Sequence, residues 1–263
     1  MPNYGHTRCE YDAPPTLSTG TDHTPKMEIL TEKNILAVDN NHPDAQHFIV
    51  ITYQDGNISH IPRGFFRNNH DEDIINANYG RFSIGRDSCL GVGSIAKYDG
   101  NAQGLYIGRH VRGGLRLKFL LNGQHETRTL AMSMFSGLMR IPPPPQYADT
   151  IVRNDIWIGD EAMFLGGAFI DNGCIIGART LIPPNFKSEP YGIYAGSPAK
   201  LLRFRFTEKV REALLQLAWW DMPFSWIREH NEHFLVDLTA DEQRSLDVLS
   251  ELLDKKARAS NIE

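Results

Sequence analysis

The chain has little cysteine and no long hydrophobic run. Its three cysteines, Cys9, Cys89 and Cys174, are too few and too scattered for a disulfide framework, and none has a CxxC partner. No early apolar stretch resembles a signal peptide, and no stretch is long enough to cross a bilayer. We therefore expect a cytoplasmic protein without a membrane span. Cys174 is expected to pack in the core.

Basic charge and the common catalytic signatures are also lacking. The 27 Lys and Arg residues against 32 Asp and Glu give a net charge of -5, which does not favour a nucleic-acid partner. The motifs GxGxxG, GxSxG and HExxH do not occur, so dinucleotide, hydrolase and zinc-protease sites are unsupported. His230 and His233 form only an HxxH spacing, and His6, His23 and His42 have no ligand-like spacing. We expect no metal site, and we expect the three N-terminal histidines to be solvated.

A six-residue period is the strongest pattern present. Neither the alternation of a strand nor the three-and-four spacing of a helix explains it, and a repeat architecture does. Large apolar residues share one phase, and the fourth residue after each of the first four is small. The large set is Ile158, Phe164, Ile170, Ile176 and Ile182, and the small set is Ala162, Ala168, Cys174 and Thr180. The period predicts a three-sided coil with stacked aliphatic residues inside; the alternative is an ordinary buried sheet with chance spacing.

Three segments are predicted around this repeat. They are an N-terminal extension at 1–77, a β-helix domain at 78–200 with a long loop at 120–149, and a helical segment at 201–263. In the extension, residues 34–38 resemble a strand, and residues 47–53 and 58–61 a β-hairpin around Asp-Gly-Asn.

The C-terminal segment has helical periodicity. We expect helices near 207–217, 224–234 and 240–259. They are expected to cover the open end of the coil, because an uncovered terminal coil presents unpaired edges.

Two short motifs in and after the repeat carry a family resemblance. Asp155-Ile156-Trp157-Ile158-Gly159 and the Ala-Gly-Ser-Pro-Ala-Lys stretch ending at Lys200 resemble hexapeptide-repeat acyltransferases. With the paired tryptophans Trp219 and Trp220, they are most similar to the xenobiotic branch, which includes virginiamycin-type and chloramphenicol-type acetyltransferases. The resemblance covers about residues 78–232. It implies a mainly β fold, a left-handed parallel β-helix, assembled as a homotrimer with sites at subunit interfaces, and acetyl-CoA as cosubstrate.

The resemblance also implies a catalytic histidine in the long loop. His125 lies where the family has an Asn-Gly motif ending in its general base, and imidazole, with a usual pKa near ~6.5, suits proton removal from a hydroxyl. Asn122, Gln124 and Glu126 are candidate substrate-binding residues beside it. Here Gln124 alone separates the glycine from His125, whereas the family usually has two residues there. His110, within a coil, is expected to pack structurally.

Cofactor contacts are carried over from the family in the same way. Small residues allow the backbone to approach the pantetheine arm, basic side chains reach the phosphates, and a tryptophan lies beside the thioester. The corresponding residues here are Gly167, Gly177, Ala178, Arg179, Lys200 and Trp157. For Trp157, core or interface packing is the alternative.

These observations predict an acetyl-CoA-dependent O-acetyltransferase that acts by direct transfer. The expected acceptor is a hydroxyl of a sugar, a glycan or a small natural product, with a slight preference for a carbohydrate. The alternatives are a streptogramin or chloramphenicol acetyltransferase, an N-acyltransferase on a sugar amine, and a non-catalytic β-helix scaffold. The shortened spacing at Gln124 favours the scaffold, whereas the joint presence of His125, Trp157 and Lys200 favours the enzyme.

Overall fold

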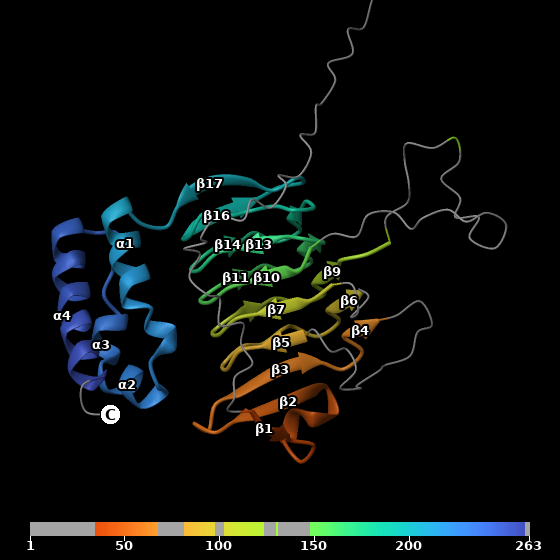
Figure 1. Ribbon diagram of the computed structural model, residues 1–263, viewed down its shortest axis with the longest axis horizontal. Coiled ribbons are helices and arrows are strands. Elements are labelled where there is room, and N and C mark those ends of the chain that lie inside the picture. The colour runs from red at the N-terminus through yellow and green to blue at the C-terminus, as the bar shows by residue number, and fades with distance from the viewer. Residues whose placement is uncertain (1–34, 68–81, 98–102, 124–129, 131–147, 261–263) are drawn as a thin grey trace, which may run out of the picture.

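The computed structural model describes residues 35–67, 82–97, 103–123, 130 and 148–260. It shows a stack of short parallel strands with helices beside it (Figure 1). The prediction of a mainly β chain with C-terminal helices is confirmed. The left-handed winding of the coil stays a prediction.

Three sheets form the three faces of the stack. The first face contains β5 (Phe82–Ile84), β7 (Leu105–Ile107), β10 (Thr150–Val152) and β13 (Phe169–Ile170). The second face contains β8 (Arg112–Gly113), β11 (Trp157–Ile158), β14 (Ile175–Ile176), β16 (Gly192–Ala195) and the antiparallel β17 (Lys200–Phe204). The third face contains β4 (Phe66–Arg67), β6 (Ile95–Lys97), β9 (Lys118–Leu120), β12 (Met163–Leu165) and β15 (Leu181–Ile182). The chain visits the faces in turn, so each circuit is one coil.

The six-residue phase forms the core of the coil. All five large residues of the period and all four small ones have no exposed surface. Ile158 lies in register with Ile176, and Phe164 with Ile182, so the large side chains stack from coil to coil. The rings of Phe119 and Phe164 stack with centroids 4.8 Å apart. The predicted repeat is confirmed.

The sequence separation between residues stacked in neighbouring coils shows where extra residues are inserted into the repeat. In the last coils, partners such as Arg153 and Asp171 are 18 residues apart. Across the segment between β9 and β10 they are 45 apart, as in the bond from the Leu115 N–H to Asp160 Oδ1. Additional residues therefore stand between these two strands, and the long loop predicted at 120–149 stays a prediction. Residues 124–129 and 131–147 lie outside the described residues.

A β-hairpin covers the start of the stack. β1 (Ile35–Val38), β2 (Phe48–Tyr53) and β3 (Ile58–Pro62) form an antiparallel sheet, and the 3-10 helix η1 (Pro43–Gln46) connects the first two. The predicted strand and hairpin are confirmed. His60 bridges Cys89 in parallel, and this bridge joins the hairpin to the first coil. The predicted boundary between residues 77 and 78 falls outside the described residues and stays a prediction.

The C-terminal segment folds as a small helical layer. It contains α1 (Glu208–Leu217), the 3-10 helix η2 (Trp219–Asp221), α2 (Phe224–Glu229), α3 (Asn231–Phe234) and α4 (Glu242–Ser260). The single helix expected over 224–234 is interrupted at His230, whose φ of -110° and ψ of 23° are not helical. No helix in the described part of the chain is long and apolar enough to cross a bilayer.

The expectation that these helices cover the open end of the coil is wrong. They lie along the side of the stack (Figure 1). Two physical features explain this position. α1 and α4 bury Leu214 and Leu252 in a core of their own, separate from that of the coil. The Arg86 guanidinium of the first coil donates hydrogen bonds to the Trp220 and Met222 carbonyls, which fixes the helical layer to the side.

Candidate functional site

The stack has three corners, each formed by the turns that connect two neighbouring faces. The first corner, between the first and second faces, includes residues 85–87, 108–110 and 153–155, and the helical layer covers it. The second corner, between the second and third faces, includes residues 114–116, 159–161, 177–179 and 196–198. The third corner, between the third and first faces, includes residues 121–123 and 166–168.

Most of the predicted cofactor residues lie along the second corner. Gly177, Ala178 and Arg179 form its turn between β14 and β15, and Lys200 begins β17 directly after the turn at 196–198. Ala178, Arg179 and Lys200 are exposed. A Cβ on Gly159, one coil earlier, would come within 2.5 Å of the Ala178 backbone nitrogen. The corner is thus built from closely stacked backbone, which a ligand can approach only where side chains are small.

Arg179 is exposed but already has a partner. Its Nε donates to Glu161 Oε2 at 2.7 Å, and Arg116 Nη2 donates to Glu161 Oε1 at 2.7 Å. These hydrogen bonds from Arg116 and Arg179 hold the pKa of the Glu161 carboxyl below its usual value. Sequence reasoning missed Glu161, although its 18-residue distance from Arg179 equals the coil repeat.

Two other predicted residues lie at the third corner. Gly167 adopts a φ of 81°, and its N–H donates to Thr150 Oγ1 at 3.1 Å. Asn122 lies at the base of the insertion, and its Oδ1 is buried with no hydrogen-bond partner among the described residues. The predicted base His125 and its neighbours Gln124 and Glu126 lie outside the described residues.

Trp157 lies on the second face and points outward. It is 59% exposed, and in the strand register it lies between Arg112 and Ile175. Packing in the core of its own chain is therefore excluded. Packing at a subunit interface and contact with a ligand remain as the two roles considered for Trp157.

One chain does not bring these groups together. The third face separates Asn122 and Gly167 from Gly177, Ala178 and Lys200. The three-residue strand β12 alone spans on the order of 10 Å at ~3.3 Å per residue. A ligand that contacts both corners therefore requires either a long molecule or a second chain.

The first corner contains an ionic network that supports the helices. His110 Nδ1 lies 2.9 Å from Asp87 Oδ2, which also accepts a hydrogen bond from Arg112 Nη2 at 2.7 Å. Burial acts to raise the pKa of Asp87, but the hydrogen bonds from His110 and Arg112 outweigh it, so this pKa is lowered. The His110 ring lies 4.7 Å from the Trp219 ring. His110 thus packs structurally, as expected.

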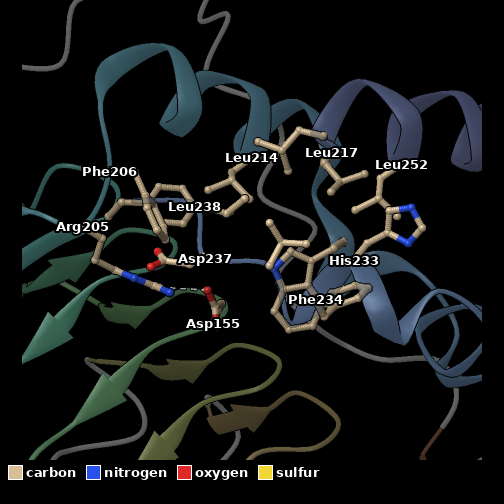
Figure 2. Close-up of a pocket in the computed structure, with 14 residues that line it drawn as sticks. Asp155, Arg205, Phe206, Leu214, Leu217, His233, Phe234, Asp237, Leu238 and Leu252 are labelled. Carbon is tan, nitrogen blue, oxygen red and sulfur yellow. Dashed lines mark hydrogen bonds and ion pairs between the residues drawn. The ribbon is translucent and has the colours of Figure 1, made fainter. Parts of the chain in front are cut away.

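A cavity of about 360 Å³ lies between the first corner and the helical layer (Figure 2). Its wall is mostly apolar, with Leu214, Leu217 and Phe234 among its residues, and Asp155 and Arg205 lie at its polar end. Burial raises the pKa of Asp155, against the opposing charge of Arg205. Sequence reasoning missed this cavity, because its residues come from distant parts of the chain that only tertiary packing brings together.

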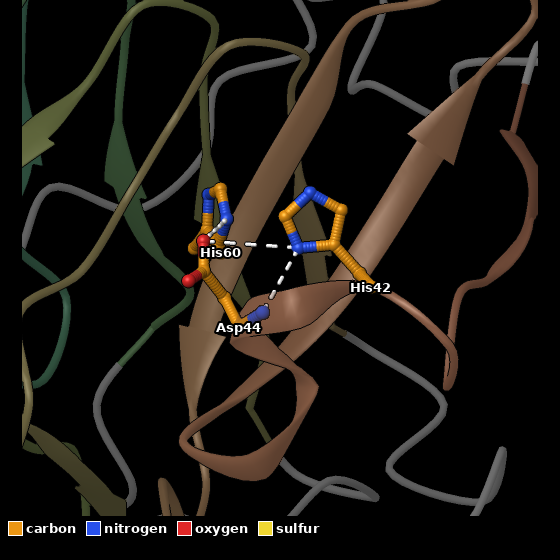
Figure 3. A group of neighbouring side chains, drawn as sticks. All are labelled: His42, Asp44 and His60. Atoms are coloured by element: carbon orange, nitrogen blue, oxygen red, sulfur yellow. Dashed lines mark hydrogen bonds and ion pairs between the residues drawn. The ribbon is translucent and has the colours of Figure 1, made fainter.

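The hairpin contains a second group that the sequence did not reveal. His42, Asp44 and His60 place one ligand-type atom each within 4.8 Å of the others (Figure 3). We had expected His42 to be solvated, and instead its side chain is only 26% exposed and lies beside Asp44. Among the described residues, the HxxH pair His230 and His233 does not belong to such a group. His230 Nδ1 lies 2.8 Å from the Trp226 carbonyl oxygen, and His233 Nε2 lies 3.3 Å from a Glu251 carboxylate oxygen.

Comparison with known proteins agrees with the repeat and the motifs. No family model matches the chain. The probable macrolide acetyltransferase of Lysinibacillus sphaericus is 32% identical over 126 residues, which cover 44% of this chain and 69% of that protein. The chain belongs to the hexapeptide-repeat xenobiotic acetyltransferases. A chloramphenicol acetyltransferase of Escherichia coli is 46% identical to this acetyltransferase family member over 81 residues, or 31% of this chain and 38% of the relative.

The matched region is only part of these relatives. A chloramphenicol acetyltransferase of Agrobacterium fabrum is 33% identical over 135 residues, covering 48% of this chain and 63% of the relative. The chain thus spans less than two thirds of the length of these chloramphenicol acetyltransferases. Among solved structures, a hexapeptide-repeat acetyltransferase of Vibrio cholerae complexed with acetyl-CoA is 19% identical, with a TM-score of 0.39. That likeness covers 53% of this chain and 64% of the other chain.

Proposed function

We propose that the chain is an acetyltransferase that moves the acetyl group of acetyl-CoA to a hydroxyl of a small molecule. One observation carries this proposal: Gly177, Ala178 and Lys200 lie along one exposed corner of a chain that belongs to an acetyltransferase family. The named relatives act as chloramphenicol or macrolide acetyltransferases, according to their names.

The second corner fits the donor in shape and charge. The stacked backbone at Gly159 and Ala178 leaves no room for a side chain between coils, so an extended pantetheine arm meets a smooth, narrow surface. Lys200 supplies a positive charge for the nucleotide phosphates. Arg179 supplies a second charge, which its bond to Glu161 partly neutralises.

A homotrimer of left-handed coils is part of the proposal. The two groups of predicted residues lie on opposite edges of the third face, and in this proposal a second chain supplies one of them. Exposed Trp157 on the second face is then available for contact at the subunit interface or with the thioester end of the donor. This arrangement places the site between subunits.

His125 is the proposed general base. It removes the proton of the acceptor hydroxyl as the oxygen attacks the thioester carbonyl; a C–O bond forms and the C–S bond breaks. The proton then passes to the leaving thiolate, so that free CoA and an acetyl ester are the products. Asn122, Gln124 and Glu126 would position the acceptor. The buried, unpaired Asn122 Oδ1 supports an additional polar partner at the base of the insertion.

The names of the relatives bear on the class of the acceptor. Their names favour a hydroxyl of an antibiotic-like natural product, such as chloramphenicol or a macrolide, over the carbohydrate favoured by the sequence. The matches cover less than half of this chain, so a sugar hydroxyl stays in the panel as the second class.

The test is thiol release from acetyl-CoA in the presence of chloramphenicol, a macrolide, a streptogramin, simple sugars or an amino sugar. We expect acceptor-dependent release, lost by at least ~100-fold in His125→Ala while acetyl-CoA still binds. His47→Ala, which removes an exposed histidine far along the chain, is the matched control and should keep full activity. Normal turnover in His125→Ala would overturn the assignment of the base. Absence of both acetyl-CoA binding and thiol release would instead support the scaffold.

A further inference from the structure

Two imidazoles and one carboxylate meet where the N-terminal hairpin begins. His42 precedes η1, Asp44 lies within it, and His60 lies in the middle of β3 (Figure 3). Asp44 Oδ2 lies 3.3 Å from His60 Nε2 and 3.7 Å from His42 Nδ1. The three atoms lie within 4.8 Å of one another.

These separations match those of ligands around one small cation. Ligand bonds of ~2.0–2.1 Å in a tetrahedron place neighbouring ligand atoms ~3.3–3.4 Å apart. The two distances from Asp44 Oδ2 are close to this value, and the remaining pair, His42 Nδ1 and His60 Nε2, lies within 4.8 Å.

His60 is held in place before any ion binds. Its backbone N–H donates to the Ser88 carbonyl at 2.9 Å, and its backbone carbonyl accepts from the Leu90 N–H at 3.1 Å. The Phe48 ring lies edge-on to the imidazole, with centroids 5.4 Å apart. His60 Nε2 is buried and has no hydrogen-bond partner in the described part of the chain. Nε2 faces Asp44 Oδ2 at 3.3 Å as an ion pair without hydrogen-bond geometry, and a cation bound between the two atoms would satisfy both.

We propose that His42 Nδ1, Asp44 Oδ2 and His60 Nε2 bind one divalent transition-metal ion, with Zn²⁺ as the preferred ion. Two imidazoles and a carboxylate suit Zn²⁺ better than Mg²⁺ or Ca²⁺, which prefer oxygen ligands. Water completes the tetrahedron. His42 Nδ1 now accepts a 3.2 Å hydrogen bond from the Asp44 N–H, and the ion replaces this long, exposed bond.

The ion would connect η1 to β3. Because His60 also bridges Cys89 of the first coil, it would fasten the hairpin to the start of the stack. The proposal is independent of acetyl transfer, since none of its residues lies at the second or third corner. Its alternative is a carboxylate that pairs with the two imidazoles and binds no metal.

The test is a Zn²⁺ titration of the full chain, free of any histidine tag and first treated with EDTA, by calorimetry and by thermal unfolding. We expect one Zn²⁺ per chain and a higher unfolding temperature, with no comparable effect of Mg²⁺. Asp44→Asn and His60→Ala should each weaken binding at least ~10-fold. His47→Ala removes an exposed imidazole next to η1 and should bind as wild type does.

The control for folding is the unfolding temperature of each variant in EDTA. Asp44 is more than half exposed, so Asp44→Asn should fold even if His60→Ala does not. Equal Zn²⁺ binding by wild type and Asp44→Asn would overturn the proposal, as would loss of binding in His47→Ala. Absence of Zn²⁺ binding in the wild type would leave the carboxylate-imidazole pairing as the correct description.

Discussion

Arg205 donates a hydrogen bond from Nη1 to Oδ2 of Asp155 at 3.2 Å, which joins the helical layer to the third coil. The same nitrogen donates to the Gly173 carbonyl at 2.9 Å. The Arg205 guanidinium also lies over the Phe206 ring, 4.9 Å from its centroid. One side chain thus connects two coils to the helices and closes the polar end of the cavity.

Removal of Arg205 should destabilise the protein by leaving a half-buried carboxylate unpaired. We expect Arg205→Met to lower the free energy of unfolding by about 2–3 kcal/mol, measured by urea denaturation. In an Asp155→Asn background the same change should cost less, because no charge remains to be paired. Equal costs in the two backgrounds would show that packing on Phe206, and not the ion pair, is responsible.

Two consecutive residues of β11 should respond in opposite ways. Ile158 is fully buried, so Ile158→Ala should cost about 2–5 kcal/mol of stability through lost contacts and a residual cavity. Trp157 is 59% exposed, so Trp157→Ala should change stability by no more than about 0.5 kcal/mol. If Trp157 contacts the donor, the same variant should raise the KM for acetyl-CoA. Calorimetric unfolding and steady-state kinetics of both variants provide the measurements.

Glu161 should restrain Arg179 from binding phosphate. Glu161→Gln removes the charge that Arg179 now contacts, and we expect a lower KM for acetyl-CoA as a result. Arg179→Gln should raise that KM. The difference in KM between this variant and wild type should shrink at high salt, because salt screens exposed charges. Thermal unfolding should differ little among these proteins. An unchanged KM in both variants would remove Arg179 from the donor site.

The pH dependence of stability should reveal the Asp87 network. The lowered pKa of Asp87 means that its carboxylate stabilises the fold above the unfolded pKa of about 3.8 and that this contribution is lost as pH falls through the lower folded pKa. Asp87→Asn should therefore be about 1–2 kcal/mol less stable than wild type at pH 7. The difference should shrink below about pH 4, where wild type also becomes protonated. A difference that grows in acid would contradict this assignment.

Cys174 should be unreactive in the folded protein. Burial raises the pKa of its thiol from 9.0 to about 11, so little thiolate forms at pH 8. With Ellman's reagent, wild type and Cys174→Ala should release equal amounts of chromophore when folded. After denaturation, wild type should release one equivalent more. A folded-state difference would mean that the coil opens at this position.

The repeat could be predicted because its physical basis is local. Every six residues the chain repeats the same step of one strand and one corner, so the regular spacing of Ile176 from Cys174 and Thr180 is visible without any distant contact. The hairpin was predictable for the same reason, since Asp55, Gly56 and Asn57 encode its turn. The break at His230 was not, because helical periodicity continues across a backbone kink.

The sequence by itself determined the coil, the hairpin, the positions of the helices along the chain and the motifs at Trp157 and Lys200. Only the tertiary structure decided that the helices lie beside the stack and that Glu161 holds Arg179. It also decided that His60 meets His42 and Asp44. The physical reason is that a repeat specifies its own periodic contacts, whereas contacts between separate segments depend on how whole surfaces pack, on which a linear pattern carries no information.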